Sequence, residues 1–274
     1  MDTYTQKTKE WLENRFRECN PDGIYYAHQP IYGLRRGYSE IRPVKRYIIT
    51  HQIMSALSHI KFDSFFDTGG AEGYKAWVAS QLFSVKAISS DLSEEGCKRA
   101  REIFGVAALT ADIHQLPFKN DAFDVVLCSE TLEHVADLNQ AMAEIIRVAR
   151  KAVIITVPHE AQSVIETVIR NRVPDGHIRA FDMHSFDFLK DRYQIITGKM
   201  ISPRLKKLFL HHFGKRGADI QIRLHAAFCR LTGDYENILC VILKNRACWS
   251  DKVKKNISPY SIIRFSVPFH YLAR

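Results

Sequence analysis

The chain has 274 residues, of which 46% are hydrophobic and 25% are charged, the balance of a globular protein with a large core. Its net charge of +9 favours acidic partners such as RNA, phosphorylated substrates or anionic lipid. The six cysteines form no C-x-x-C pair, which argues against a zinc ribbon or a thioredoxin-type site. The N-terminus has no apolar signal core, and no apolar stretch is long enough to span a membrane. We therefore expect a cytoplasmic protein, peripheral at a membrane if its basic segments bind lipid.

The chain begins with a segment that predicts a helical cap. A helical pattern spans 4–18, an irregular stretch spans 21–45, and a second helix spans 46–60. Beyond residue 60, short apolar strands alternate with helical patterns, which predicts βαβ units and a parallel sheet. The expected organisation is a cap at 1–60, a doubly wound α/β domain at 61–245 with a basic insertion at 202–235, and a basic tail at 246–274.

The predicted sheet follows from runs of apolar residues between turn signals. Its strands are Ser64–Thr68, Lys86–Asp91, Ala107–Ala111, Phe123–Ser129, Ala152–Val157 and two later ones near Tyr193–Ile201 and Asn237–Leu243. The helices between them are Tyr74–Phe83, Ser93–Phe104 and Leu138–Arg150. The run AVIITV in the fifth strand is typical of a central parallel strand, and Pro158 ends it.

A glycine-rich turn follows the first strand, in the run Asp67-Thr68-Gly69-Gly70-Ala71-Glu72-Gly73. Glycines permit a tight strand-to-helix turn and a close approach of the backbone to a ligand. Because Ala71 and Tyr74 stand where G-x-G-x-x-G requires glycine, and no G-K-[ST] follows, the loop suits a ligand without pyrophosphate. Asp67 would suit the ammonium of an amino-acid ligand. A turn that only connects strand and helix is the alternative.

Acidic residues also end the next two strands. The carboxylate of Asp91 can accept from the two hydroxyls of a ribose, or it can simply cap the following helix. Asp112 can accept from an exocyclic amine, and its neighbour Ile113 can cover a purine face.

Taken together, these residues resemble the class I S-adenosylmethionine-dependent methyltransferases, in the broad type 11 group that includes ubiquinone-pathway enzymes. The motif D-x-G-x-G-x-G is similar to Asp67–Gly73, with Ala71 in place of the middle glycine, and the run from Leu116 to Val135 is similar to the family's LPF…FD-V…LEHV stretch. The resemblance covers roughly 60 to 200. It implies a Rossmann-like seven-stranded sheet with an antiparallel last strand, a lid of N-terminal helices, and S-adenosyl-L-methionine as cofactor. The cofactor-binding residues it implies are Asp67, Gly69, Gly70, Ala71, Gly73, Asp91, Leu92, Asp112, Ile113 and Ser129.

The candidate catalytic residues are Glu130, Glu133 and His134, which follow the fourth strand, where ligands of open α/β sheets bind. His134 could act as a general base toward a hydroxyl acceptor. Alternatively, the two glutamates only favour a helix N-terminus and His134 packs on the surface. The hypothesis that Glu130, Glu133 and His134 are catalytic includes no metal. However, E-x-x-E-H with the later His177 resembles the divalent-metal site of small-RNA 2′-O-methyltransferases, where a metal could orient and deprotonate a diol.

The basic insertion holds seven Lys and Arg residues against one acid between 202 and 230. Its run PRLKKLFLHHF predicts a basic amphipathic helix that could bind an anionic membrane surface or RNA, or could form a solvated lid. No DNA-binding module is visible.

The function we expect is methyl transfer to a small-molecule or lipid- or glycan-linked acceptor, most simply O-methylation. The alternatives are a metal-dependent RNA 2′-O-methyltransferase, a non-catalytic binding domain and, more distantly, a nicotinamide oxidoreductase. The acceptor should be selected by 1–60, 174–190 and 202–235.

Overall fold

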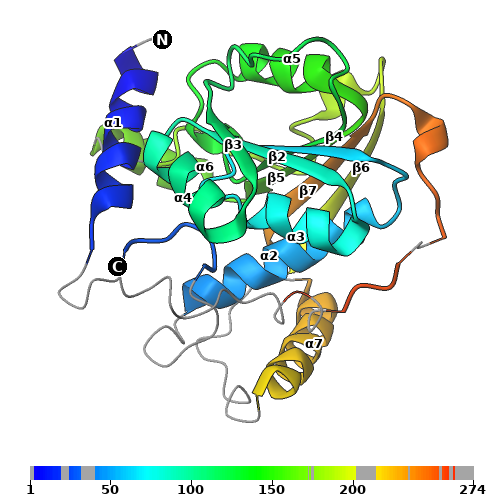
Figure 1. Ribbon diagram of the computed structural model, residues 1–274. Helices are drawn as coiled ribbons and strands as arrows, with labels where there is room; N and C mark the ends of the chain where they lie inside the picture. Colours follow the sequence, from blue (N-terminus) through cyan, green and yellow to red (C-terminus); the bar gives the residue numbers. More distant parts are fainter. Residues whose placement is uncertain are drawn as a thin grey trace.

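The computed structural model describes residues 3–19, 25–31, 41–171, 173, 176–201, 214–233, 235–252, 255–258 and 262. Within this part of the chain, seven strands form one mixed sheet in the order β3-β2-β1-β4-β5-β7-β6 (Figure 1). The strands are β1 (Ser64–Thr68), β2 (Lys86–Asp91), β3 (Ala107–Thr110), β4 (Phe123–Ser129), β5 (Ala149–Pro158), β6 (Gln194–Ile201) and β7 (Tyr235–Leu243). The helices are α1 (Thr3–Arg17), α2 (Ile41–Leu57), α3 (Tyr74–Phe83), α4 (Glu94–Phe104), α5 (Leu138–Val148), α6 (Gln162–Arg170) and α7 (Gly214–Thr232). Single 3₁₀ turns are η1 (Leu132–His134), η2 (Asp187–Leu189) and η4 (Arg246–Cys248).

The strand pairing confirms the predicted fold class. Strands β1 to β5 pair in parallel, and β7 runs antiparallel to both β5 and β6. The strand order switches between β1 and β4: β2 and β3 follow on the side of β1, and β5 follows on the side of β4. Such a switch point opens a crevice at the carboxyl ends of the strands, where ligands of open α/β sheets bind.

Alternating side chains of the buried strands build a core on each face of the sheet. Phe65, Val125 and Leu127 pack with α2 and α3 on one face. Phe66 and Val126 pack with α5 on the other. Because neighbouring residues of a strand point to opposite faces, an apolar run such as the one in β4 fills both cores.

Local signals fix several helix ends. Ser93 accepts a hydrogen bond from the Gly96 amide at 3.1 Å and caps α4, which ends at Gly105 with φ 64°. Asp137 caps α5 through the Gln140 amide at 3.0 Å. The bounds of β1, β2, β4 and α3 are those predicted from the sequence.

Some bounds differ from the prediction. Helix α2 begins at Ile41, five residues before the predicted 46, because Pro43 is tolerated in a first helical turn. Strand β5 begins at Ala149, where a helix was predicted to continue to 150, since Ala149 pairs with Phe123. The predicted amphipathic run 203–213 lies outside the described residues, and α7 follows it. Among the described helices, none is both long and apolar enough to cross a membrane.

The structure describes all six cysteines; they form no disulfide, and five of them are buried. Burial raises the pKa of the Cys97 thiol to about 11 and also raises the pKa of Cys240, to about 12. Cys19 alone is exposed, directly after α1.

Candidate cofactor pocket and active site

A pocket of about 270 Å³ lies at the carboxyl ends of β1, β2 and β4. It brings together residues that are far apart in sequence, from α1 to the segment that follows α6. The sequence-predicted residues in its wall are Gly69, Ala71, Asp91, Leu92, Ile113, Ser129, Glu130, Glu133, His134 and His177. Four others, Asp67, Gly70, Gly73 and Asp112, lie outside the wall.

Gly69 is the point where the turn requires glycine. Its φ is +70°, and a Cβ atom there would lie 2.3 Å from Oγ1 of Thr131. Ala71 also has a positive φ, of 49°, a conformation that costs a residue with a Cβ about 1–2 kcal/mol. The turn therefore accepts a side chain at the middle position of the motif and excludes one at the first.

Asp67 lies under the turn and is fully buried. A Cβ atom on Gly70 would lie 2.9 Å from its Oδ2, so Gly70 covers the carboxylate. Neither oxygen meets a donor in hydrogen-bonding geometry among the described residues. Burial raises the pKa of Asp67 to about 7, opposed by the nearby charge of Lys75. The Asp67 carboxylate therefore packs beneath the turn, against Gly70.

Asp91 ties the turn to the next strand. Its Oδ2 accepts from the Ala71 amide at 2.8 Å, and its Oδ1 accepts from the Ser93 amide at 3.0 Å. Because a carboxylate oxygen has a second lone pair, Asp91 can still accept from a diol in the pocket. Burial raises its pKa, and the hydrogen bonds oppose that shift. The cap of α4 is Ser93 and not Asp91, whereas the place of Asp91 in the pocket wall is compatible with the diol contact.

Of the two predicted residues after β3, one lines the pocket and the other makes hydrogen bonds within its own loop. Ile113 is in the pocket wall. Oδ1 of Asp112 instead accepts from the His114 amide at 2.9 Å and faces Nδ1 of the His114 ring at 2.7 Å. Asp112 therefore orders this loop.

The N-terminal segment forms the outer wall. Trp11 and Phe16 of α1, with Tyr26 and His28, line the pocket. The buried carboxylate of Glu72 accepts from the amides of His28 and Gln29 at 2.9 and 3.0 Å. Burial raises the pKa of Glu72 to about 7. The glycine turn thus holds this segment over the pocket.

Helix α1 is also attached to α4. The carboxylate of Glu13 accepts from the amide of Glu94 at 2.5 Å and from that of Glu95 at 3.3 Å. These amides belong to the first turn of α4, where free donors and the helix dipole favour an anion.

Arg46 of α2 supplies a cation to the pocket wall. It is half-buried, and among the described residues its guanidinium makes neither a hydrogen bond nor an ion pair. A planar guanidinium in this state suits a ligand carboxylate, which it can bind through two parallel hydrogen bonds.

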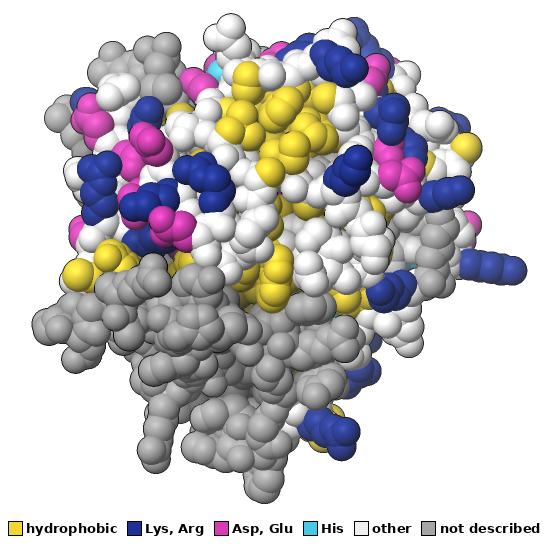
Figure 2. Space-filling view, viewed as in Figure 1, with side chains coloured by type: hydrophobic (Ala, Val, Ile, Leu, Met, Phe, Trp, Pro, Cys, Tyr) yellow, Lys and Arg dark blue, Asp and Glu magenta, His cyan; other side chains and the backbone are white. Residues whose placement is uncertain are grey.

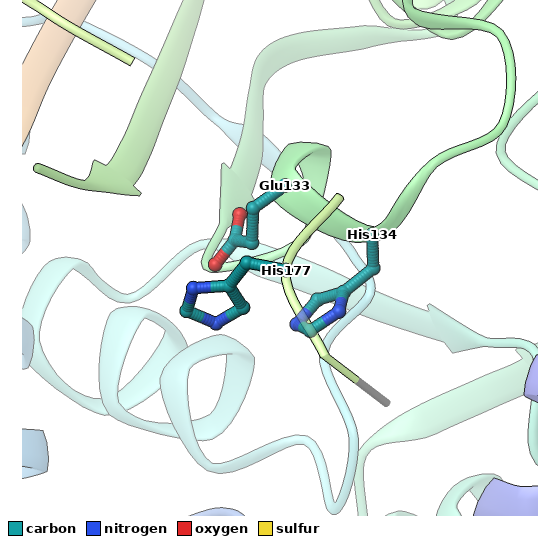
Figure 3. Close-up of side chains that lie close together, drawn as sticks. All are labelled: Glu133, His134 and His177. Atoms are coloured by element: carbon teal, nitrogen blue, oxygen red, sulfur yellow. The ribbon is translucent and has the colours of Figure 1, made fainter. Parts of the chain in front are cut away.

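Glu133, His134 and His177 lie close together (Figure 3), and all three line the pocket. One ligand atom of each lies within 4.8 Å of those of the other two. Oε2 of Glu133 is buried without a hydrogen-bond partner among the described residues. Burial and the charge of Glu130 raise the pKa of Glu133 well above its ordinary value. Burial lowers the pKa of His134 to about 4, so its ring is neutral near pH 7.

His177 is positioned from two sides. The amide of the next residue, Ile178, donates to the Glu133 carbonyl at 2.9 Å, and Nδ1 of His177 makes a short contact with Oε2 of Glu160. A carboxylate on one ring nitrogen fixes the ring and leaves the other nitrogen for a ligand.

Glu130 is held apart from this cluster. Nδ2 of Asn237 donates to both of its oxygens at 2.9 Å, and Oγ1 of Thr156 donates to one at 3.1 Å. Its φ is +56°. Oγ of Ser129 continues this network at 2.7 Å from Thr156. The metal hypothesis drawn from the sequence named four residues. Three of them, Glu133, His134 and His177, lie close together, whereas Glu130 is hydrogen-bonded to Asn237 of β7.

Residues 66–157 match a family model described as a methyltransferase domain. The chain carries a methyltransferase domain. This match confirms the resemblance to S-adenosylmethionine-dependent methyltransferases, and it covers the turn, the acids after β2 and β3, and the E-x-x-E-H run. No curated protein matches the chain in sequence.

Solved methyltransferases share the fold of this methyltransferase domain. The geranyl diphosphate C-methyltransferase of Streptomyces coelicolor A3(2), in complex with Mg²⁺, geranyl diphosphate and S-adenosyl-L-homocysteine, is 15% identical with a TM-score of 0.56, covering 89% of this chain and 98% of that chain. The putative methyltransferase in complex with the Haloferax volcanii Trm112 activator is 17% identical with a TM-score of 0.53, covering 71% and 88%. Phosphoethanolamine N-methyltransferase 2 of Haemonchus contortus, in complex with S-adenosyl-L-methionine, is 17% identical with a TM-score of 0.50, covering 77% and 59%.

Several pocket residues of the methyltransferase domain and its N-terminal segment were not predicted. Thr131 packs on Gly69 across the crevice, and Arg46 reaches the pocket from a helix before β1. Trp11, Tyr26 and His28 had no individual signal, although the family resemblance implied a lid from this part of the chain. Their positions depend on contacts between distant segments.

Proposed function

We propose that this chain transfers a methyl group from S-adenosyl-L-methionine to a hydroxyl oxygen of a small-molecule or lipid-linked acceptor. The observation that carries the proposal is the cluster of Glu133, His134 and His177 in the same pocket as the glycine turn. The turn and Asp91 suit a nucleoside ligand, and the cluster suits activation of a hydroxyl.

The pocket residues fit each part of the cofactor. Gly69 and Ala71 bring the turn into the pocket wall, and Asp91 can accept from the ribose hydroxyls. Ile113 and Leu92 offer apolar cover for the adenine. The guanidinium of Arg46, which has no ion-pair partner in the part of the chain that the structure describes, suits the carboxylate of the amino-acid end. Asp67, under the turn, adds negative charge on the side where the ammonium would lie.

Methyl transfer from a sulfonium needs alignment more than activation of the methyl. The acceptor oxygen attacks the methyl carbon, the carbon–sulfur bond breaks, and S-adenosyl-L-homocysteine leaves with the electron pair. The protein must hold oxygen, carbon and sulfur in line and exclude water. The hydroxyl proton must also be removed.

The cluster supports a divalent cation better than a lone general base. With a pKa of about 4, His134 is a weak base near pH 7, but its neutral ring can bind a metal. Oε2 of Glu133, which has no hydrogen-bond partner within the described ranges, and the oriented ring of His177 complete a three-residue set. A bound divalent cation would supply acidity to an acceptor hydroxyl.

Cofactor binding is the first test. Calorimetric titration with S-adenosyl-L-methionine and S-adenosyl-L-homocysteine should give micromolar binding to the wild type. Asp91→Asn keeps one carbonyl oxygen but loses the charge and one acceptor, so we expect a loss of about ten-fold or more in affinity. Asp191→Asn, an exposed change outside the pocket wall, is the matched control and should bind within about three-fold of wild type. Absence of binding to both ligands would reject the proposed function.

The cation is tested with Mn²⁺ alone, before any acceptor is known. Titration calorimetry should show one site in the wild type and none in His177→Ala. In Glu160→Gln the ring keeps a hydrogen-bond partner but loses the carboxylate, so we expect Mn²⁺ affinity to fall about 10–100-fold. Glu166→Gln, an exposed change on α6, should leave it unchanged. Wild-type affinity in His177→Ala would exclude the cluster as a metal site.

The same cluster favours one second candidate, methylation of a ribose 2′-hydroxyl at an RNA 3′ end. A terminal ribose carries a vicinal diol that a cation at Glu133, His134 and His177 could bind through both oxygens. Transfer of labelled methyl to RNA, but not to RNA with an oxidised terminal ribose, would select this candidate over the small or lipid-linked acceptor.

A further inference from the structure

Helix α7 has one face buried and one face exposed. Gln221, Ile222 and Cys229 lie against the protein, and Ile222 belongs to the core that contains α2 and the end of β6. The exposed face carries four large apolar side chains at helical spacing, with exposed fractions of 52%, 65%, 58% and 88% for Ile220, Leu224, Phe228 and Leu231. Because residues four apart lie on one side of a helix, these four form a continuous apolar stripe.

A row of arginines borders this stripe. Arg216, Arg223 and Arg230 are spaced seven residues apart and are all exposed, so they align along one side of α7 next to the apolar residues. Asp219 is the only acidic residue in the sequence of the helix. On the face shown in Figure 2, basic side chains extend to the lower end of the molecule, where α7 lies in Figure 1.

The fold places α7 at the edge of the sheet that bears the pocket. It connects β6 to β7, and the first paired residues of this hairpin are Ile201 and Tyr235. Two residues into β7, Asn237 pairs with Pro158 at the carboxyl end of β5 and donates to Glu130. The exposed face of α7 therefore belongs to a segment that ends a few residues from the pocket wall.

We propose that α7 seats the protein on an anionic lipid surface. The stripe of Ile220, Leu224, Phe228 and Leu231 enters the interface between headgroups and acyl chains, and the arginines lie at the headgroup phosphates. This seating does not depend on catalysis. A further step does rest on the proposed function: with α7 in the interface, the pocket edge faces the membrane, and a lipid-linked acceptor has the shortest path to it.

The apolar stripe decides between lipid and RNA. RNA is bound through its phosphates by basic side chains and through its bases by stacking on aromatic rings. The stripe of α7 holds one aromatic ring and three aliphatic side chains, which gain from leaving water but give a base little to stack on. An interface that takes cations and aliphatic groups side by side is that of an anionic bilayer.

The test is flotation of the full-length protein with vesicles of phosphatidylcholine alone or with one-third phosphatidylglycerol. We expect roughly ten-fold stronger partition to the anionic vesicles. Phe228→Gln should weaken that partition by roughly ten-fold. Phe188→Gln is the matched control, because Phe188 of η2 is also 58% exposed but precedes the opposite end of β6. Both positions are exposed, so both variants should keep the wild-type melting temperature.

Wild-type protein that stays with neither vesicle, or equal losses in Phe228→Gln and Phe188→Gln, would overturn the proposal. Binding to RNA with a steep salt dependence, without vesicle binding, would assign α7 to RNA and overturn it too. Calorimetry with S-adenosyl-L-methionine, run on the same variants, separates this failure from failure of the proposed function. Phe228→Gln should bind that cofactor as the wild type does.

Discussion

At the scale of single residues, the glycine turn combines a strict position with a tolerant one. Gly69 is enclosed by Thr131, whereas Ala71 carries a Cβ at φ 49° and contributes its amide to Asp91. The sequence showed only that Ala71 departs from the glycine of the family motif. The structure shows what the departure costs: the Cβ atom of Ala71 sits at a positive φ, and the residue lies in the pocket wall.

This asymmetry predicts opposite effects of two small substitutions. Gly69→Ala combines a positive φ with overlap against Thr131, so the free energy of unfolding should fall by about 2 kcal/mol or more. Ala71→Gly relieves the positive φ but adds freedom to the unfolded chain, so we expect a change within about 1 kcal/mol, toward higher stability. Urea denaturation of both variants gives the values. Equal destabilisation would contradict this description of the turn.

Asp67 makes stability depend on pH. Burial raises its pKa to about 7 in the folded protein, above the value of about 3.9 in an unfolded chain. The contribution of Asp67 to the free energy of unfolding is therefore fully present below about pH 4 and is lost as the pH rises through 7. Asp67→Asn cannot titrate and should not show this loss.

The difference in stability between Asp67→Asn and the wild type should thus grow between pH 4 and 8. Each pKa unit corresponds to about 1.4 kcal/mol, so the difference reaches at most about 4 kcal/mol. Urea denaturation of the two proteins without cofactor, at several pH values, measures it. Glu72 titrates in both proteins, so its effect cancels. If the free energies of unfolding of the two proteins followed parallel curves against pH, the folded protein would not hold a buried, charged Asp67 above pH 7.

At the scale of elements, Glu13 joins α1 to the start of α4. Glu13→Ala removes the acceptor for two amides of α4, although Ser93 still caps that helix. Loss of a cap of this kind costs about 1 kcal/mol. Amide hydrogen exchange across 3–17 should therefore become about five-fold faster. Glu10→Ala is the matched control on the same helix, because the side-chain contact of Glu10 is exposed. Unchanged exchange in Glu13→Ala would mean that α1 is held by its apolar contacts alone.

The elements that could be predicted from sequence are those whose apolar side chains pack in the two cores of the sheet. Strands such as β4 and helix α5 have dense apolar patterns because both cores require them. Helix α6 was not predicted, and it has one buried residue, Ile165. Its sequence does have an amphipathic period, but the helix has only nine residues, fewer than the window of about 11–18 over which a helical period is usually recognised.

At the scale of the whole molecule, the site could be predicted as far as the strand ends that build it. Asp91 ends β2, and Ile113 and Glu133 follow β3 and β4, so the topology alone brings them to one edge. Arg46, Thr131 and Glu160 were beyond prediction, since their roles arise from the way α2, the turn after β4 and the segment after β5 pack around that edge. The division into cap, domain and tail stays a prediction.

The distribution of the thiols has a practical consequence. Five cysteines are enclosed by the core, while Cys19 is exposed directly after α1. A maleimide dye would therefore react first at a single position, next to the helix that forms the outer wall of the pocket. The natural chain thus contains a labelling site for following movement of α1 by fluorescence, without any cysteine having to be added or removed.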